Sequence, residues 1–378
     1  MTRNAAIHDF ARVGAFVAVV TTGALVTMWL GLDGLVQSVP YAIGATVLLA
    51  VGLFASTAGI DLDEARADIR IVVLAVTVGV LAKTAIISGV MWVVFRRPEM
   101  VLLGVVVAQI DPLSVAAIRD RSGLSPRAKT ILSAWSSFDD PITALLTVYL
   151  AVWLVAGTSS GPLALASGTG SVVVQVALNL GLALVAYGLW KVTGGARPAA
   201  RRGLQLGVQR VLLVGVAAAA VSRLLMLGLA LSGLFLRPRI DRFLVWATRI
   251  AFWLAALAVG IGLTHGVGLW AGFVLGVAAF GSQCLVGYAL TARLPRADRI
   301  DLALGHQNGI TAIILALLLE PKVPGTLAVV GPAIVVVNLL HGVTNGVWAR
   351  IRRPPDMDEK VVPQPGSPSS GRSIEAAA

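Results

Sequence analysis

The amino-acid sequence predicts an all-α polytopic membrane protein with about 12 transmembrane helices, inverted-topology repeats and two interrupted helices. The first observation is composition: 57% of the 378 residues are hydrophobic and only 13% are charged, whereas a soluble domain carries roughly 25% charged residues. The second is the recurrence of apolar runs of about 20 residues, the length that crosses a bilayer. The third is that two of these runs are interrupted near their middle. This composition excludes a soluble single-domain enzyme and a disordered chain.

The predicted spans follow one another from the N-terminus to about residue 348. In order, they are residues 11–31, 40–60, 70–95, 99–118, 130–153, 171–190, 243–263, 266–291, 301–320 and 325–348. Residues 205–236 are too long for one ordinary span and short for two. We interpret them as two short helices hinged near Ser222–Arg223, and the alternative is one long tilted helix.

The charges of the loops favour the first interpretation, two helices over residues 205–236. With twelve spans, most loop Arg and Lys residues fall on one side of the membrane, as the positive-inside rule requires. The same loops account for the net charge of +11, so nucleic acid is not predicted as a partner. We expect a multi-pass protein of the cell membrane with both termini in the cytoplasm.

The two interrupted spans occupy equivalent places in two triplets of helices, residues 70–153 and 264–348. Asp111-Pro112 interrupts the middle span of the first triplet, and Gly305–Gly309 interrupts that of the second. The two triplets start on opposite sides of the membrane. Inverted triplets with broken middle helices are typical of alternating-access transporters, which bind their substrate where the breaks meet.

Two adjacent carboxylates lie close to the centre of the span 130–153. Asp139 and Asp140 are costly at that depth and therefore indicate an ion-binding or proton-carrying site. Neighbouring helical residues point about 100° apart, so we expect one to face the ion path and the other a neighbouring helix. Pro141 cannot donate to the carbonyl of Ser137, which predicts a free acceptor beside the pair.

Further polar groups fall within predicted spans. Asp111 either neutralises a half-helix end or binds the ion directly. The side-chain oxygens of Gln307 and Asn308 suit an alkali cation, although helix–helix hydrogen bonds explain them equally well. His306 beside them is a weak signal. Lys83 lies midway along its span and should pair with a carboxylate.

Three segments of the sequence resemble a known family. Ile110-Asp-Pro112 and Ser136-Ser-Phe-Asp-Asp-Pro141 resemble the fourth and fifth helices of the monovalent cation:proton antiporter superfamily. Phe54-x4-Gly59-Ile-Asp-Leu-Asp63 is similar to the motif before its third helix. The resemblance covers about residues 45–348.

The resemblance implies an antiporter-like fold in which two interrupted helices cross. It implies exchange of Na+ (or Li+ or K+) for H+ without a cofactor, by a homodimer with a dimerisation domain and a moving core domain. It also implies Asp140 as the main cation and proton carrier, with Asp139 and Asp111 beside it. The adjacent Asp pair is similar to electrogenic bacterial members.

The sequence departs from the family in two places. Ile110 stands where the family usually has Thr, and Gln283 stands where its tenth helix usually carries Lys or Arg. Repeat symmetry relates the third span to the tenth, so we expect Lys83 to supply the missing cation opposite Asp139. The supporting polar groups of the predicted site are Lys83, Ser114, Ser137, Gln283, His306, Gln307 and Asn308.

The expected domain organisation follows from the triplets and the resemblance. Residues 1–69 and 154–263 form the dimerisation scaffold, residues 70–153 and 264–348 form the core transport domain, and residues 349–378 form a disordered cytoplasmic tail.

Two rival functions remain open from the sequence. An intramembrane aspartyl enzyme also uses two carboxylates, but it normally places them on two helices. A sodium-coupled symporter of small organic anions is the other rival, although two central negative charges repel an anion. The four His residues are scattered, which gives no metal-ligand spacing.

Overall fold

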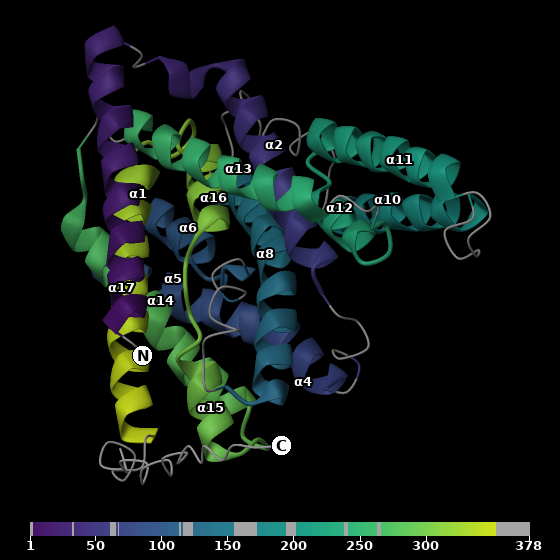
Figure 1. Cartoon of the computed structure of the whole chain (residues 1–378). Coiled ribbons are helices and arrows are strands. Elements are labelled where there is room, and N and C mark those ends of the chain that lie inside the picture. The colour runs from purple at the N-terminus through teal and green to yellow at the C-terminus, as the bar shows by residue number, and fades with distance from the viewer. Residues whose placement is uncertain are drawn as a thin grey trace, which may run out of the picture.

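The computed structural model describes residues 3–31, 34–60, 66, 68–112, 115, 124–154, 172–193, 202–237, 241–262 and 266–352. The regular secondary structure of this part of the chain is all helical, with no strand. The elements (Figure 1) are α1 Arg3–Leu30, η1 Leu35–Gln37, α2 Val39–Ala58, α4 Ile69–Leu74, η2 Ala75–Gly79, α5 Val80–Phe95, α6 Pro98–Val106, α8 Pro126–Leu154, α10 Val172–Val192, α11 Arg202–Arg223, α12 Met226–Gly233, α13 Asp241–Gly262, α14 Leu269–Leu290, α15 Arg296–Ala303, α16 Ile310–Leu319 and α17 Thr326–Arg352. Helix α17 continues four residues into the segment expected to be the tail.

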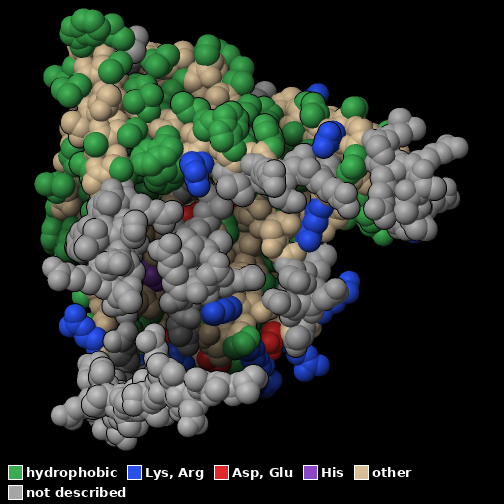
Figure 2. Space-filling view, in the orientation of Figure 1, with side chains coloured by type: hydrophobic (Ala, Val, Ile, Leu, Met, Phe, Trp, Pro, Cys, Tyr) green, Lys and Arg blue, Asp and Glu red, His purple; other side chains and the backbone are tan. Residues whose placement is uncertain are grey.

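Six helical stretches in the described residues are long and apolar enough to cross a membrane. They are Val39–Ala58, Ile69–Phe95, Val173–Val192, Leu206–Arg223, Leu269–Leu290 and Thr326–Arg352. Shorter apolar helices cover Gly14–Leu30 and Trp246–Gly262. Many large apolar side chains on these helices are exposed, and Figure 2 shows them gathered over the upper part of one face. Such a surface suits lipid, while the count of twelve spans stays a prediction.

Residues 205–236, which are too long for one ordinary span and short for two, form two helices. Helix α11 ends at Arg223 and α12 begins at Met226, with Leu224 in the left-handed region at φ 53°. The hinge therefore lies just beyond the expected position. The eight residues of α12 reach only about 12 Å, well short of the roughly 30 Å hydrocarbon core.

Both predicted interruptions are present, and they meet. The first helix is unwound from Val107 to Asp111, and the second from Leu304 to Gly309, between α15 and α16. The amide of Asp111 donates to the carbonyl of Gln307 at 2.8 Å. The interruption of one triplet is thus held by the interruption of the other, and α8 packs against α6, α15 and α16.

Close helix packing around this centre uses glycine. A Cβ on Gly272 of α14 would lie 2.6 Å from Pro332 and 2.8 Å from the carbonyl oxygen of Val329, both on α17. A Cβ on Gly104 of α6 would lie 2.7 Å from the backbone nitrogen of Ser88 on α5. Small residues allow helices in a membrane to approach closely, so both triplets are tightly packed.

Candidate ion-binding site at the helix crossing

The centre of the molecule contains three buried aspartates. Asp139 and Asp140 lie in the middle of α8 and are 0% and 1% exposed, and Asp111 in the first interruption is 4% exposed. None of the three is open to the surroundings in this conformation. A carboxylate at such a depth requires a partner or a function.

Asp139 forms a buried ion pair. Its Oδ2 lies 2.6 Å from the Nζ of Lys83 on α5, and both side chains are fully buried. The same oxygen accepts the backbone N–H of Ile110 at 3.1 Å. The Lys83 ammonium also lies 5.3 Å from the ring centroid of Trp135, close enough for a cation–π interaction. The single π-helical turn η2 precedes Lys83, and such turns are frequent at functional sites.

Asp140 points to a different helix. Its Oδ2 accepts the hydroxyl of Thr311, in the first turn of α16, at 2.8 Å. Asp111 and Asp140 also interact electrostatically. The adjacent carboxylates therefore have different partners: Asp139 binds Lys83 of α5 and Ile110 of the first interruption, and Asp140 binds Thr311 of α16.

Asp111 lies against the N-terminal end of α16. Gly309 precedes this half-helix, and a Cβ at Gly309 would overlap the carboxylate of Asp111. Only a glycine leaves room for this contact. A helix N-terminus carries partial positive charge that favours an anion, so Asp111 and Asp140 both lie where α16 begins.

The amide of Asn308 joins the two interruptions. Its Nδ2 donates to the carbonyl of Val107 at 3.3 Å. Among the described residues, Oδ1 of Asn308, Oδ1 of Asp139 and Oδ1 of Asp140 are buried without a hydrogen-bond partner. Oxygen atoms of this kind are hard ligands that suit alkali and other hard cations.

No family model matches the chain, and no curated protein matches it. Among solved structures, the sodium proton antiporter MjNhaP1 from Methanocaldococcus jannaschii at pH 8 superimposes with a TM-score of 0.64 at 15% identity, covering 89% of this chain and 99% of that one. A second structure of MjNhaP1, from an electron-microscopy map, gives a TM-score of 0.56 at 17% identity, covering 90% and 96%.

The chain has a cation:proton antiporter-like fold. This confirms the family resemblance at the level of fold. The similarity in fold extends over nearly the whole chain.

Several predicted supporting residues in this antiporter-like fold have definite partners. Gln283, on α14, donates through Nε2 to the carbonyl of Leu302 at 3.1 Å. It therefore satisfies an end carbonyl of α15 and does not reach the aspartates through this bond. His306 is fully buried within the second interruption, and Gln307 contributes its backbone carbonyl. Ser114 lies outside the described residues.

One expectation was wrong. The carbonyl of Ser137, which Pro141 leaves without its helical donor, is not a free acceptor. The hydroxyl of Ser56 on α2 donates to it at 3.1 Å. A buried carbonyl seldom stays unpaired, so α2 supplies the missing donor and is joined to α8 at the level of the aspartates.

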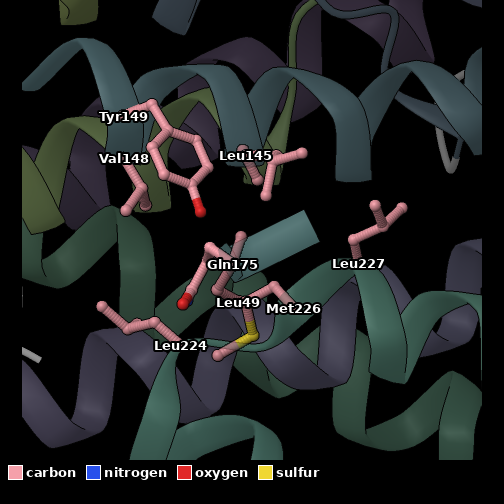
Figure 3. A pocket seen from close by; sticks show the side chains of 9 residues that line it. Leu49, Leu145, Val148, Tyr149, Gln175, Leu224, Met226 and Leu227 are labelled. Carbon is pink, nitrogen blue, oxygen red and sulfur yellow. The ribbon is translucent and has the colours of Figure 1, made fainter. Parts of the chain in front are cut away.

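A shallow pocket lies away from this site, between α2, α8, α10 and the hinge that joins α11 to α12. The Tyr149 hydroxyl and the Gln175 side-chain oxygen point into it (Figure 3). Its lining includes none of the predicted site residues, so the buried aspartates do not open into this pocket.

The sequence reasoning missed Thr311 and Ser56. A hydroxyl is common in membrane helices, so neither residue type is a signal by itself. Thr311 lies two residues after the predicted interruption, and this position in the first turn of a half-helix was the one feature that could have singled it out.

Proposed function

We propose that this protein is a secondary active antiporter that exchanges a monovalent cation, Na+ in the first place, for protons by alternating access. The observation that carries the proposal is the pair of buried aspartates on α8, of which Asp140 accepts a hydrogen bond from the crossing of two interrupted helices. The similarity in fold to a sodium proton antiporter supports it.

Competition for the same oxygens is the proposed coupling mechanism. A protonated Asp140 is neutral and is a poor cation ligand, whereas an ionised Asp140 offers a full negative charge. Cation and proton therefore exclude one another, and a conformational change that exposes the occluded site to either side moves them in opposite directions. Asn308 and Asp111 lie at the same crossing and would complete the oxygen shell.

Lys83 takes the role of the missing cation of the tenth helix in this proposal. Its ammonium neutralises Asp139, while Gln283 only caps α15. A cation that binds Asp139 then competes with Lys83 for the negative charge of this carboxylate, which ties the charge of the lysine to the transport cycle.

The remaining assignments belong to the same proposal. Residues 70–153 and 264–348 would move as the core, residues 1–69 and 154–263 would form the scaffold of a homodimer, and residues 349–378 would be a cytoplasmic tail. Both termini would face the cytoplasm, following the positive-inside bias.

The proposal is tested by pH-dye dequenching in proteoliposomes, with NaCl, LiCl and KCl added in turn and with the membrane potential clamped or free. The wild type should dissipate the pH gradient on addition of at least one salt, and Asp140→Asn should abolish this response. Asp68→Asn is the matched control, because Asp68 pairs with Arg127 at the surface. A cation-dependent proton flux that persists in Asp140→Asn would exclude Asp140 as the carrier.

A further inference from the structure

Helix α17 carries a polar stripe along the face that meets α15 and the second interruption. Its members are Asn338, His341, Asn345, Trp348 and Arg352. They are spaced three and four residues apart, which places them on one side of a helix. Because α17 is otherwise strongly apolar, a regular row of polar side chains requires a reason.

Four members of the stripe bind α15 or Leu304, the first residue of the interruption. Arg352 and Trp348 donate to the two carboxylate oxygens of Asp301 at 2.8 and 2.7 Å. Nδ2 of Asn345 donates to the carbonyl of Leu304 at 3.0 Å, and Nδ1 of His341 lies 2.9 Å from the same carbonyl.

Asn338 is the member that binds within the second interruption. Its Oδ1 accepts the backbone N–H of Asn308 at 3.3 Å, and its Nδ2 donates to the backbone carbonyl of Asn308 at 2.9 Å. One side-chain amide thus pairs with both backbone groups of a single unwound residue. Without it, these groups would have no helical partner in a setting with little water.

The fixed residue, Asn308, is the one whose side chain bridges to Val107 of the first interruption. With Nδ2 used in that bridge, Oδ1 of Asn308 is left as a buried acceptor with no partner in the described part of the chain. The backbone carbonyl next to it, that of Gln307, holds the amide of Asp111. The position of Asn308 therefore determines where an amide oxygen and Asp111 lie relative to one another.

We propose that Asn338 is a positioning residue for the cation: it holds the unwound backbone so that the side-chain oxygen of Asn308 is presented to the ion. The rest of the stripe holds α15 to α17 and has a structural role. This inference rests on the proposed antiport function, and it assigns a role to a residue that acts through the backbone of Asn308.

The test compares Asn338→Leu with Asn345→Leu, which makes the same change two turns along the same stripe. Leu339→Ala, on the exposed face of α17, is the control for unchanged exchange. The readout is the cation dependence of the initial proton flux in proteoliposomes, together with the thermal unfolding midpoint of each variant. If Asn338→Leu fails to assemble, the smaller change Asn338→Ser, which keeps one hydrogen-bonding group, replaces it.

We expect Asn338→Leu to raise the apparent KM for the cation about tenfold, equal to about 1.4 kcal/mol, with a smaller effect on the maximal rate. Asn345→Leu should lower the unfolding midpoint while leaving the apparent KM within about twofold of wild type. Equal KM values in Asn338→Leu, Asn345→Leu and wild type would overturn the positioning role while antiport itself stands. A wild type that shows no cation-dependent flux with any alkali salt would instead overturn the proposed function.

Discussion

Removal of the Lys83 ammonium should lower the stability of the protein, because it leaves the buried carboxylate of Asp139 without its ionic partner. Lys83→Met keeps the length of the side chain and removes its charge, leaving the Ile110 N–H as the only hydrogen-bond donor to Asp139 Oδ2 in the described structure. At the observed 2.6 Å, two unit charges attract by about 6 kcal/mol at an effective dielectric constant of about 20. Loss of one partner of a fully buried pair typically costs about 3–5 kcal/mol, so we expect a loss of stability in that range.

The double variant Lys83→Met/Asp139→Asn distinguishes the ion pair from simple packing. It removes both charges and keeps a neutral acceptor for the Ile110 N–H. Its stability should return most of the way to wild type, which corresponds to a coupling energy of about 2 kcal/mol or more in a double-mutant cycle.

Thermal unfolding of the purified protein in detergent, followed by intrinsic fluorescence, measures these differences. Lys191→Met, at the exposed end of α10, is the matched control and should unfold like wild type. Additive effects of the two single changes would refute the reasoning. An unchanged pH profile of exchange in Lys83→Met would separately remove Lys83 from the transport mechanism.

Three further substitutions test individual contacts of the site. Thr311→Val removes the hydroxyl donor to Asp140, and it should raise the apparent KM for the cation at least about tenfold because such a bond contributes about 1.5–3 kcal/mol. Gly309→Ala places a methyl group in the carboxylate of Asp111 and should abolish exchange, whereas Gly281→Ala, with open space around it, should not; equal activity of the two would contradict the packing argument. Ser56→Ala leaves a proline-freed carbonyl of α8 without its donor, and thermal unfolding should show a loss of about 1–3 kcal/mol.

The sequence predicts the parts of this fold that depend on local chemistry. Prolines and glycines remove helical hydrogen bonds or free the backbone, so both interruptions could be located at Asp111-Pro112 and Gly305–Gly309. The hinge between α11 and α12 was likewise expected within two residues of its observed place, because loop charges required two helices there. The high cost of a lone charge at that depth predicted that Lys83 pairs with a carboxylate, and repeat symmetry together with the family resemblance singled out Asp139.

The rest depends on which helices meet, and periodicity does not reveal this. That Ser56 of α2 would satisfy the carbonyl of Ser137 required knowledge that α2 packs on α8. The same holds for Thr311 and Asn338, since their roles arise from contact with Asp140 and Asn308 across the crossing. Asn338 carried a weak sequence signal, the three- and four-residue spacing of polar groups along an apolar helix, that could have indicated an internal face.

The central claim is that protons and a cation compete for the same buried aspartates. The most direct measurement is the apparent KM for the cation in proteoliposomes over a series of pH values with the membrane potential clamped. Competition predicts that KM rises about tenfold for each pH unit of acidification below the ionisation range of the site if one proton competes, and more steeply if two do. A KM that stays constant across this pH range, while the maximal rate alone changes, would contradict the account.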